Sequence, residues 1–154
     1  MQSKYKISLE DTINVPPHNL DAEQMVIGAM LLESKYALSK IGDKIKPELF
    51  YKESNALIVE SIIELYKTRE QIDLLTVANH LKKRGKLDDV GGPYGLSQIT
   101  NRLASAKSIE SHLLIITEYH MRREIIAANG TSIHKAFDLS FDVFNIIGDQ
   151  QTAL

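Results

Sequence analysis

The sequence predicts an all-α fold in which a small helical head is followed by a long antiparallel helical hairpin. Residues 108–137 contain no proline and a single glycine, Gly130, and their apolar residues recur with a period close to 3.6. No stretch shows the convincing alternation of apolar and polar residues that is typical of a half-buried strand. Because 44% of the 154 residues are apolar, the chain can bury a core without disulfide bonds.

The helix predicted over 108–137 is too long to be contained in a compact head. At ~1.5 Å per residue it measures about 40–45 Å, whereas a compact chain of this size has a radius of gyration of about 15 Å. Part of the helix must protrude, and residues 140–151 can fold back on it as a second arm. Two helices alone bury little surface, so the outer face of this hairpin is predicted to be an association surface.

About five helices are expected in the head. Pro16-Pro17 predicts an extended approach to the first helix, which Asn19 is expected to cap. Asp73 is expected to cap the fourth helix, and Gly85 suits the position after its end. Pro93 suits the first position of the fifth helix. The expected ranges are 21–34, 36–45, 54–68, 74–84 and 93–101.

Periodicity also predicts which faces of the head helices are buried. The expected stripes are Ala22, Val26, Ala29, Met30 and Leu32 on the first helix, Ile58, Val59, Ile62, Ile63 and Tyr66 on the third, and Leu74, Val77, Ala78 and Leu81 on the fourth. The predicted domain organisation is a flexible arm over 1–15, the head over 16–104, and the hairpin over 105–152.

Composition narrows the class of protein. The chain has no cysteine, which excludes disulfides, thiolate metal sites and cysteine nucleophiles and suits a reducing compartment. Its net charge of −2 and pI of about 6.2 argue against a domain that binds nucleic acid on its own. No apolar run reaches the ~18–20 residues of a membrane span, and the first residues lack the apolar core of a signal peptide. The expected compartment is the cytoplasm.

No catalytic, cofactor-binding or metal-binding residue is predicted. The glycines at 85 and 91–95 lack the spacing of a phosphate loop, and they are better explained as helix-capping turns. His112 and His120 are about two helical turns apart, too far to share a metal ion unaided. Glu60 and Glu64 share a helix face that is interpreted as solvated. The basic run 82–86 lies at a helix end, where cations are favoured.

Tyr94 and the pair Arg122-Arg123 are the more informative side chains. Tyr94 follows a Gly-Gly-Pro turn, and its amphipathic ring is interpreted as an anchor between the head and the hairpin, with direct contact to a partner as the alternative. Arg122-Arg123 lie in the long helix, either solvated or facing a carboxylate of a partner.

Three stretches together resemble the N-terminal domain of replicative DNA helicases of the DnaB family. The order and spacing of these stretches, rather than any one motif, make the resemblance specific, and it covers about residues 15–152. The stretches are 15–24 (VPPHNLDAEQ) running into 26–32 (VIGAMLL); 72–77 (IDLLTV) with 85–87 (GKL) and 90–94 (VGGPY); and 105–112 (SAKSIESH).

The resemblance implies an all-helical head and hairpin whose hairpins pair between neighbouring subunits, forming a collar on a ring of six. It implies that this collar receives the C-terminal domain of primase and, in some systems, a helicase loader. It also implies that ATP and Mg²⁺ belong to a separate motor domain, which moves 5′ to 3′ along single-stranded DNA. The linker to that motor is expected to begin at 153–154, so the fragment itself is expected not to be an enzyme. No membrane contact is expected either.

The resemblance carries few residue roles. Asp21 and Tyr94 occupy positions expected to support the arrangement of head and hairpin that primase contacts. Interface candidates on the hairpin are Tyr119, Arg122, Arg123 and His134. Lys107-Ser108 replaces the Ala-Asn that is frequent in the family, so the start of the hairpin is expected to differ. Two other classes remain as alternatives: a small helical DNA-binding regulator and, more distantly, an acid/base enzyme.

Overall fold

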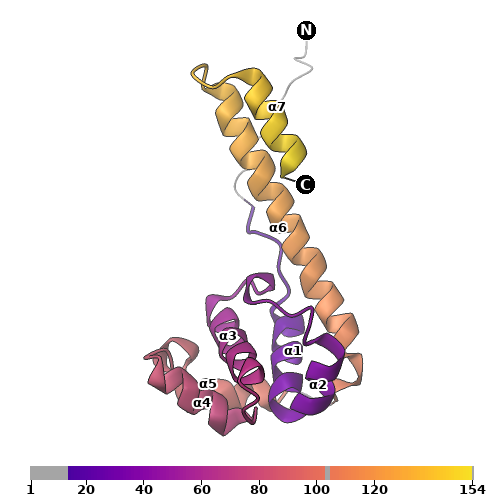
Figure 1. Ribbon diagram of the computed structural model, residues 1–154, viewed down its shortest axis with the longest axis vertical. Helices are drawn as coiled ribbons and strands as arrows, with labels where there is room; N and C mark the ends of the chain where they lie inside the picture. The colour runs from indigo at the N-terminus through magenta and orange to yellow at the C-terminus, as the bar shows by residue number, and fades with distance from the viewer. Residues whose placement is uncertain (1–13, 103–104, 154) are drawn as a thin grey trace.

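The computed structural model describes residues 14–102 and 105–153, and within them it has seven α-helices and no strand. The predicted all-α class is therefore confirmed. The expected N-terminal arm falls almost entirely outside the described residues. Figure 1 shows five helices packed as a head, with a sixth rising out of it and a seventh folded back along its far half. The α-helices are α1 (Leu20–Leu32), α2 (Ser34–Ile41), α3 (Glu53–Lys67), α4 (Leu74–Lys83), α5 (Gly92–Thr100), α6 (Ile109–Phe137) and α7 (Val143–Thr152).

Helix α1 is the centre of the head. Asn19 caps it as predicted, since its Oδ1 accepts a hydrogen bond from the Ala22 N–H at 2.9 Å. The helix contacts α2, α3, α5 and α6, and residues 26–31 are all buried, so it is covered all round rather than along one stripe. Leu32, predicted to be buried, is exposed because it ends α1 where the chain turns into α2.

Helix α2 ends earlier than predicted. The Gly42 N–H bonds the Leu38 carbonyl, and the N–H groups of Lys44 and Ile45 both return to the Ile41 carbonyl. These bonds close the helix in a turn and leave Ile45 buried in the core. A short 3₁₀ turn, η2 (Pro47–Leu49), then leads to α3. The residues between α2 and α3 therefore belong to the packing of the head and not to a longer helix.

Helices α3 and α4 pack against each other and confirm most of the predicted stripes. Ile58, Val59 and Ile62 are buried on α3, as are Val77, Ala78 and Leu81 on α4, but Tyr66 was wrongly placed and is exposed. Asp73 and Thr76 form a capping box at the start of α4. Hydrogen bonds from the backbone and side chain of Thr76 hold the pKa of Asp73 below its ordinary value.

Both helices end in the same Schellman motif but with different residues in the left-handed position. After α4, Gly85 has φ +68°, and the Lys86 N–H bonds the Leu81 carbonyl. After α3, Arg69 adopts φ +59°, and the Glu70 N–H bonds the Leu65 carbonyl. Glycine enters this region without steric cost, whereas a residue with a Cβ does not. The left-handed backbone conformation of Arg69 is therefore unfavourable for a residue of this type.

Arg69→Gly should stabilise the protein by about 0.5–1 kcal/mol, because the backbone keeps its conformation and the steric cost of the Cβ disappears. Arg69 is exposed, so no packing is lost. Urea unfolding followed by circular dichroism measures the change. Gly85→Ala is the matched control and should shift the stability in the opposite direction by a similar amount. A destabilised Arg69→Gly variant would contradict this account.

The core of the head continues into the long helix. Another 3₁₀ turn, η4 (Ala106–Ser108), leads into α6, and Ala106, Ile109, Leu113 and Ile116 are all buried in the same cluster as α1–α5. Beyond Ile116, none of the described residues of α6 or α7 is buried. The first two turns of α6 therefore anchor the hairpin in the head, and the remainder projects from it.

Candidate functional site: the projecting hairpin and its base

The hairpin predicted from residues 108–151 is present. Helix α6 is about 44 Å long at ~1.5 Å per residue, and α7 packs antiparallel against its far half (Figure 1). The Lys135 amine lies 2.7 Å from the Asp149 carboxylate, and the Gln150 amide donates to Asn129 at 3.2 Å. Asp142 caps α7 by accepting from the N–H groups of Phe144 and Asn145.

The hairpin exposes large apolar side chains on both of its helices. We call this set the hairpin surface. It comprises Leu114, Ile115, Met121, Ile125, Ile126, Ile133 and Phe137 of α6, Leu139 and Phe141 of the connecting turn, and Val143, Phe144 and Ile147 of α7. Exposed apolar side chains gathered on a projecting element are typical of an association surface. The association surface stays a prediction.

Arg123 joins α6 to the head and is half-buried, not exposed as expected, while its role at an interface stays a prediction. Its two terminal nitrogens donate to the backbone carbonyls of Pro17 and Leu49, each at 2.9 Å. Its guanidinium also lies 5.6 Å from the centre of the Tyr51 ring, on which His18 stacks at 4.2 Å. A single side chain thus ties α6 to the approach to α1 and to the segment before α3. Periodicity could not identify carbonyls so distant in sequence.

Glu23 has a role that sequence analysis did not identify, beyond its favourable position in the first turn of α1. Its carboxylate is 1% exposed and accepts from the Tyr51 N–H at 2.6 Å and from the Asn55 amide at 2.7 Å. Lys52, at the cap position of α3, provides no side-chain cap of its own. Glu23 of α1 therefore caps α3 from a neighbouring helix. The sequence signal that could have indicated this role was the absence of a capping residue at the start of α3.

Asp21 and Tyr94 are both on the surface of the head. The Asp21 side chain is 87% exposed and lies 3.6 Å from Arg102, just after α5. Tyr94 is 73% exposed on α5, so the interpretation of its ring as a wedge between head and hairpin was wrong. The reason is that α5 packs on α1 and α4 and presents this side chain to solvent. Contact of Tyr94 with a partner remains the open alternative.

The other hairpin candidates differ in their surroundings. Arg122 is exposed and pairs with Glu118, one turn earlier, at 2.8 Å. Tyr119 is half-buried and His134 is exposed. An exposed pair of this kind contributes little to stability, so Arg122 can change partners at small cost. Because its side chain is exposed, it is accessible to another chain.

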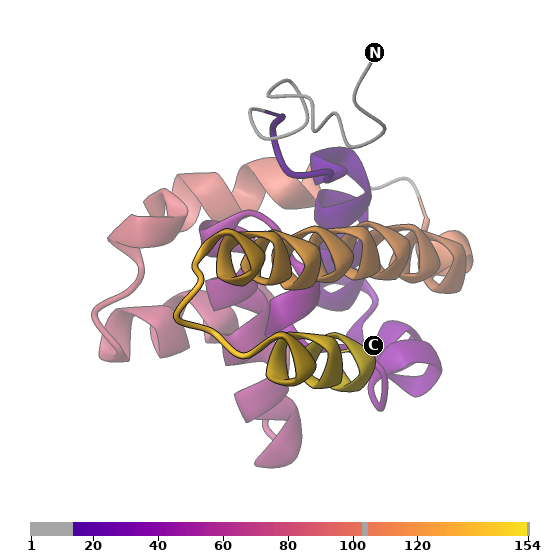
Figure 2. The same ribbon diagram turned by 90° about the horizontal axis from the view of Figure 1, so that it is seen from above.

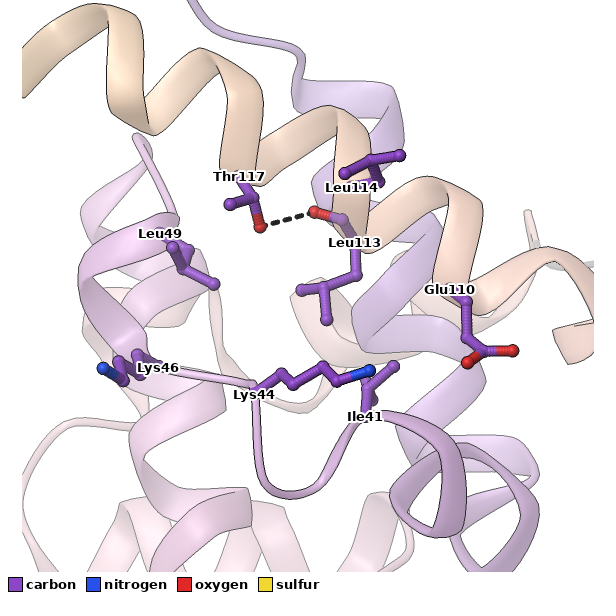
Figure 3. A pocket seen from close by; sticks show the side chains of 8 residues that line it. All are labelled: Ile41, Lys44, Lys46, Leu49, Glu110, Leu113, Leu114 and Thr117. Carbon is purple, nitrogen blue, oxygen red and sulfur yellow. Dashed lines mark hydrogen bonds between the residues drawn. The ribbon is translucent and has the colours of Figure 1, made fainter.

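A cavity of about 470 Å³ lies where α6 leaves the head (Figure 3). We call it the base pocket. Ile41, Leu49 and Leu113 form its apolar floor, and the exposed Leu114 stands at its rim. Lys44 and Lys46 border it from the turn after α2, and Glu110 borders it from α6. Within the described residues neither lysine pairs with a carboxylate.

The residues that were considered for chemistry have other surroundings in the structure. No three histidine, aspartate or glutamate side chains gather there as metal ligands would. Gly85 and Gly91 form helix ends, as predicted, instead of a loop around a phosphate. Glu60 and Glu64 pair with Arg84 and His80. None of the helices in 14–102 or 105–153 is long and apolar enough to cross a membrane.

A packed head that carries a long, largely uncovered hairpin defines a class of all-helical head-and-hairpin domains. The sequence pattern described as DnaB-like helicase N terminal domain matches residues 15–118 of this chain. The chain therefore belongs to the DnaB-like helicase N-terminal domain family.

Individual relatives agree with this assignment. The replicative DNA helicase DnaB of Rhodothermus marinus is 34% identical over 140 residues, which are 91% of this chain but only 15% of that protein. The N-terminal domain of DnaB helicase from Mycobacterium tuberculosis superposes with a TM-score of 0.84 at 27% identity, covering 90% of this chain and 98% of that one.

A more distant structure shares the fold. It is a DnaB-like replicative helicase described with its interactions with primase. It superposes with a TM-score of 0.73 at 22% identity, covering 88% of this chain and 30% of that one.

Proposed function

We propose that this chain is the N-terminal assembly domain of a hexameric replicative DNA helicase and that it acts in the cytoplasm. The hairpins of neighbouring subunits pair to form a collar, while a motor domain elsewhere in the protein binds ATP and Mg²⁺ and unwinds DNA 5′ to 3′. In this proposal the head comprises residues 16–104, the hairpin comprises 105–152, and the linker to the motor begins at 153–154.

The hairpin surface is the observation that carries the proposal. Apart from Leu114 and Ile115, its apolar side chains on α6 lie beyond the part of that helix that the head covers, and α7 leaves them exposed. Membership of the helicase N-terminal domain family supplies the context in which a second copy of the chain would cover them. Pairing of hairpins would set the spacing between subunits, so the domain would work by geometry and not by chemistry.

The second part of the proposal is that the collar docks primase. The support is that a structural neighbour is described with its interactions with primase. Tyr94 is a candidate contact because a large, exposed ring on a rigid helix is typical of interface anchors. Asp21, Tyr119 and His134 remain candidates for the same docking. A helicase loader is a further candidate partner.

Light scattering across a concentration series of the 154-residue chain tests self-association. A mass that rises to a dimer or a hexamer is the expected result, followed by titration with the C-terminal domain of primase. A monomer at every concentration, with no binding of primase, would contradict both parts of the proposal. Salt-sensitive binding of duplex DNA by the isolated domain would favour the helical DNA-binding regulator instead.

Arg122→Glu should weaken self-association or primase binding by about tenfold without unfolding the head. The new carboxylate would lie one turn from Glu118 and would repel any acidic group that Arg122 meets on a partner. Sedimentation equilibrium and primase titration measure the effect. Lys83→Glu makes the same charge change on α4 of the head and should leave both affinities unchanged. If Arg122→Glu behaves like this control, Arg122 is not at an interface.

A further inference from the structure

The turn at the tip of the hairpin combines an unusually exposed leucine with two carboxylates. Leu139 is 96% exposed, between Asp138, which ends α6, and Asp142, which caps α7. Hydrogen bonds from the side chain and backbone of Ser140 hold the pKa of Asp138 below its ordinary value, so it is charged at neutral pH. In the described residues neither aspartate pairs with a cation.

The base pocket has the complementary composition. Its floor is apolar, and Figure 3 shows Lys44 extending across its mouth, whereas the Lys46 amine points away from the pocket at its edge. An apolar side chain flanked by carboxylates would therefore fill the pocket and meet the Lys44 amine. At the tip of the hairpin, Leu139 lies between the carboxylates of Asp138 and Asp142, which is this arrangement.

The tip cannot reach the base pocket of its own chain. Leu114 and Leu139 are about 35 Å apart along the helix at ~1.5 Å per residue. Thr117 and Lys135 lie on the same face of α6, because a separation of eighteen positions makes five helical turns. Helix α7 covers that face at Lys135, whereas the pocket opens on it at Thr117. Figure 2 shows α7 and α2 on the same side of α6.

We infer that the hairpins pair antiparallel, with Leu139 of each copy inserted in the base pocket of the other. This inference rests on the hairpin pairing proposed above and specifies its direction and register. One tip and one pocket per chain, at the two ends of one straight helix, allow both contacts to form at once about a two-fold axis. The axis would pass close to Ile126, midway between the two. In a parallel pair, neither Leu139 would enter a base pocket, and the carboxylates of the two tips would lie next to each other.

Disulfide trapping tests the register, because the chain has no cysteine of its own. Leu114→Cys and Leu139→Cys, mixed and oxidised, should form a cross-linked heterodimer, identified by a size tag on one of them. Each variant alone should give none, because its two cysteines would lie about 35 Å apart, far beyond the ~4 Å that a disulfide spans between Cβ atoms. Leu75→Cys, on the exposed face of α4, is the control and should not cross-link with Leu139→Cys.

Charge reversal provides an independent readout in solution. Lys44→Glu and Asp138→Lys should each weaken self-association about tenfold, because like charges then meet at both contacts. An equimolar mixture should recover the original affinity, since the heterodimer has one reversed and one unchanged contact. Recovery is not expected if the two residues act only on the stability of their own chain.

The outcomes separate this inference from the proposed function. Cross-linking in the mixture alone, with recovery by mixing, supports the tip and pocket contact. A dimer by light scattering without specific cross-linking overturns the contact but leaves hairpin pairing standing. Cross-linking of Leu139→Cys with itself shows a parallel pair and overturns the register. A monomer at every concentration overturns the pairing and the contact together.

Discussion

Glu23→Ala should lower the free energy of unfolding by about 3–4 kcal/mol, a large effect for one polar side chain. The buried carboxylate accepts from the Tyr51 N–H and the Asn55 amide, and more distantly from the Lys52 N–H. Alanine would leave these donors without a partner in the core and would open a cavity beside them. Urea unfolding followed by circular dichroism measures the change.

Two variants keep this prediction falsifiable. Glu23→Gln retains an acceptor but loses the charge, so about 1–2 kcal/mol should be lost, and this variant remains measurable if the alanine form does not fold. Asp21→Ala removes an equally acidic but exposed side chain from the same helix turn and should change stability by less than about 0.5 kcal/mol. Equal losses for Asp21→Ala and Glu23→Ala would exclude the capping of α3 by Glu23.

Arg123→Ala should lower the free energy of unfolding by about 2–3 kcal/mol and weaken the attachment of α6 to the head. The substitution removes two charge-assisted hydrogen bonds, to the carbonyls of Pro17 and Leu49, and the contact with the Tyr51 ring. Amide hydrogen exchange should increase at His18 and around Tyr51, which lie next to the lost contacts. Chemical denaturation measures the loss in free energy of unfolding, and hydrogen exchange identifies the residues that lose protection.

Arg122→Ala is the matched control for this prediction, since it removes the neighbouring arginine, whose only described partner is Glu118 on the same helix. The loss should be at most about 0.5 kcal/mol, with no change in exchange in the head. The loss of stability in Arg123→Lys should lie between those of Arg122→Ala and Arg123→Ala, because one ammonium group lacks the planar fork that reaches both carbonyls. Similar losses for Arg122→Ala and Arg123→Ala would mean that Arg123 does not anchor α6.

The elements of the fold could be predicted from local pattern because their signals are local. The capping residues Asn19 and Asp73 bond backbone groups within three positions, and both act as predicted. The protrusion of α6 followed from length alone, since a helix of its span exceeds the size of a head of this mass. The boundaries of α2 were less accurate, because a turn stabilised by Ile41 and packed by Ile45 has no equally local signal.

The candidate site was only partly accessible from sequence. The hairpin surface was anticipated because apolar periodicity marks a face wherever that face is buried, whether by the same chain or by another. Periodicity gave no information on Tyr94 and Arg123, whose surroundings depend on which elements lie opposite. Adjacent arginines with the same chemistry therefore have different roles, one bonded to the head and one facing solvent.

The sequence by itself determined the helical class, the projecting hairpin and the absence of phosphate-loop and cysteine chemistry, because these depend on periodicity, chain length and residue type. Only the tertiary structure decided that Glu23 accepts from the Tyr51 N–H, twenty-eight residues away at the approach to α3, that Arg123 ties α6 to two carbonyls of the head, and that Lys44 and Lys46 border an apolar pocket at the base of the hairpin. These contacts join residues distant in the chain, and the partner of a polar group is set by packing in space, which local sequence does not encode.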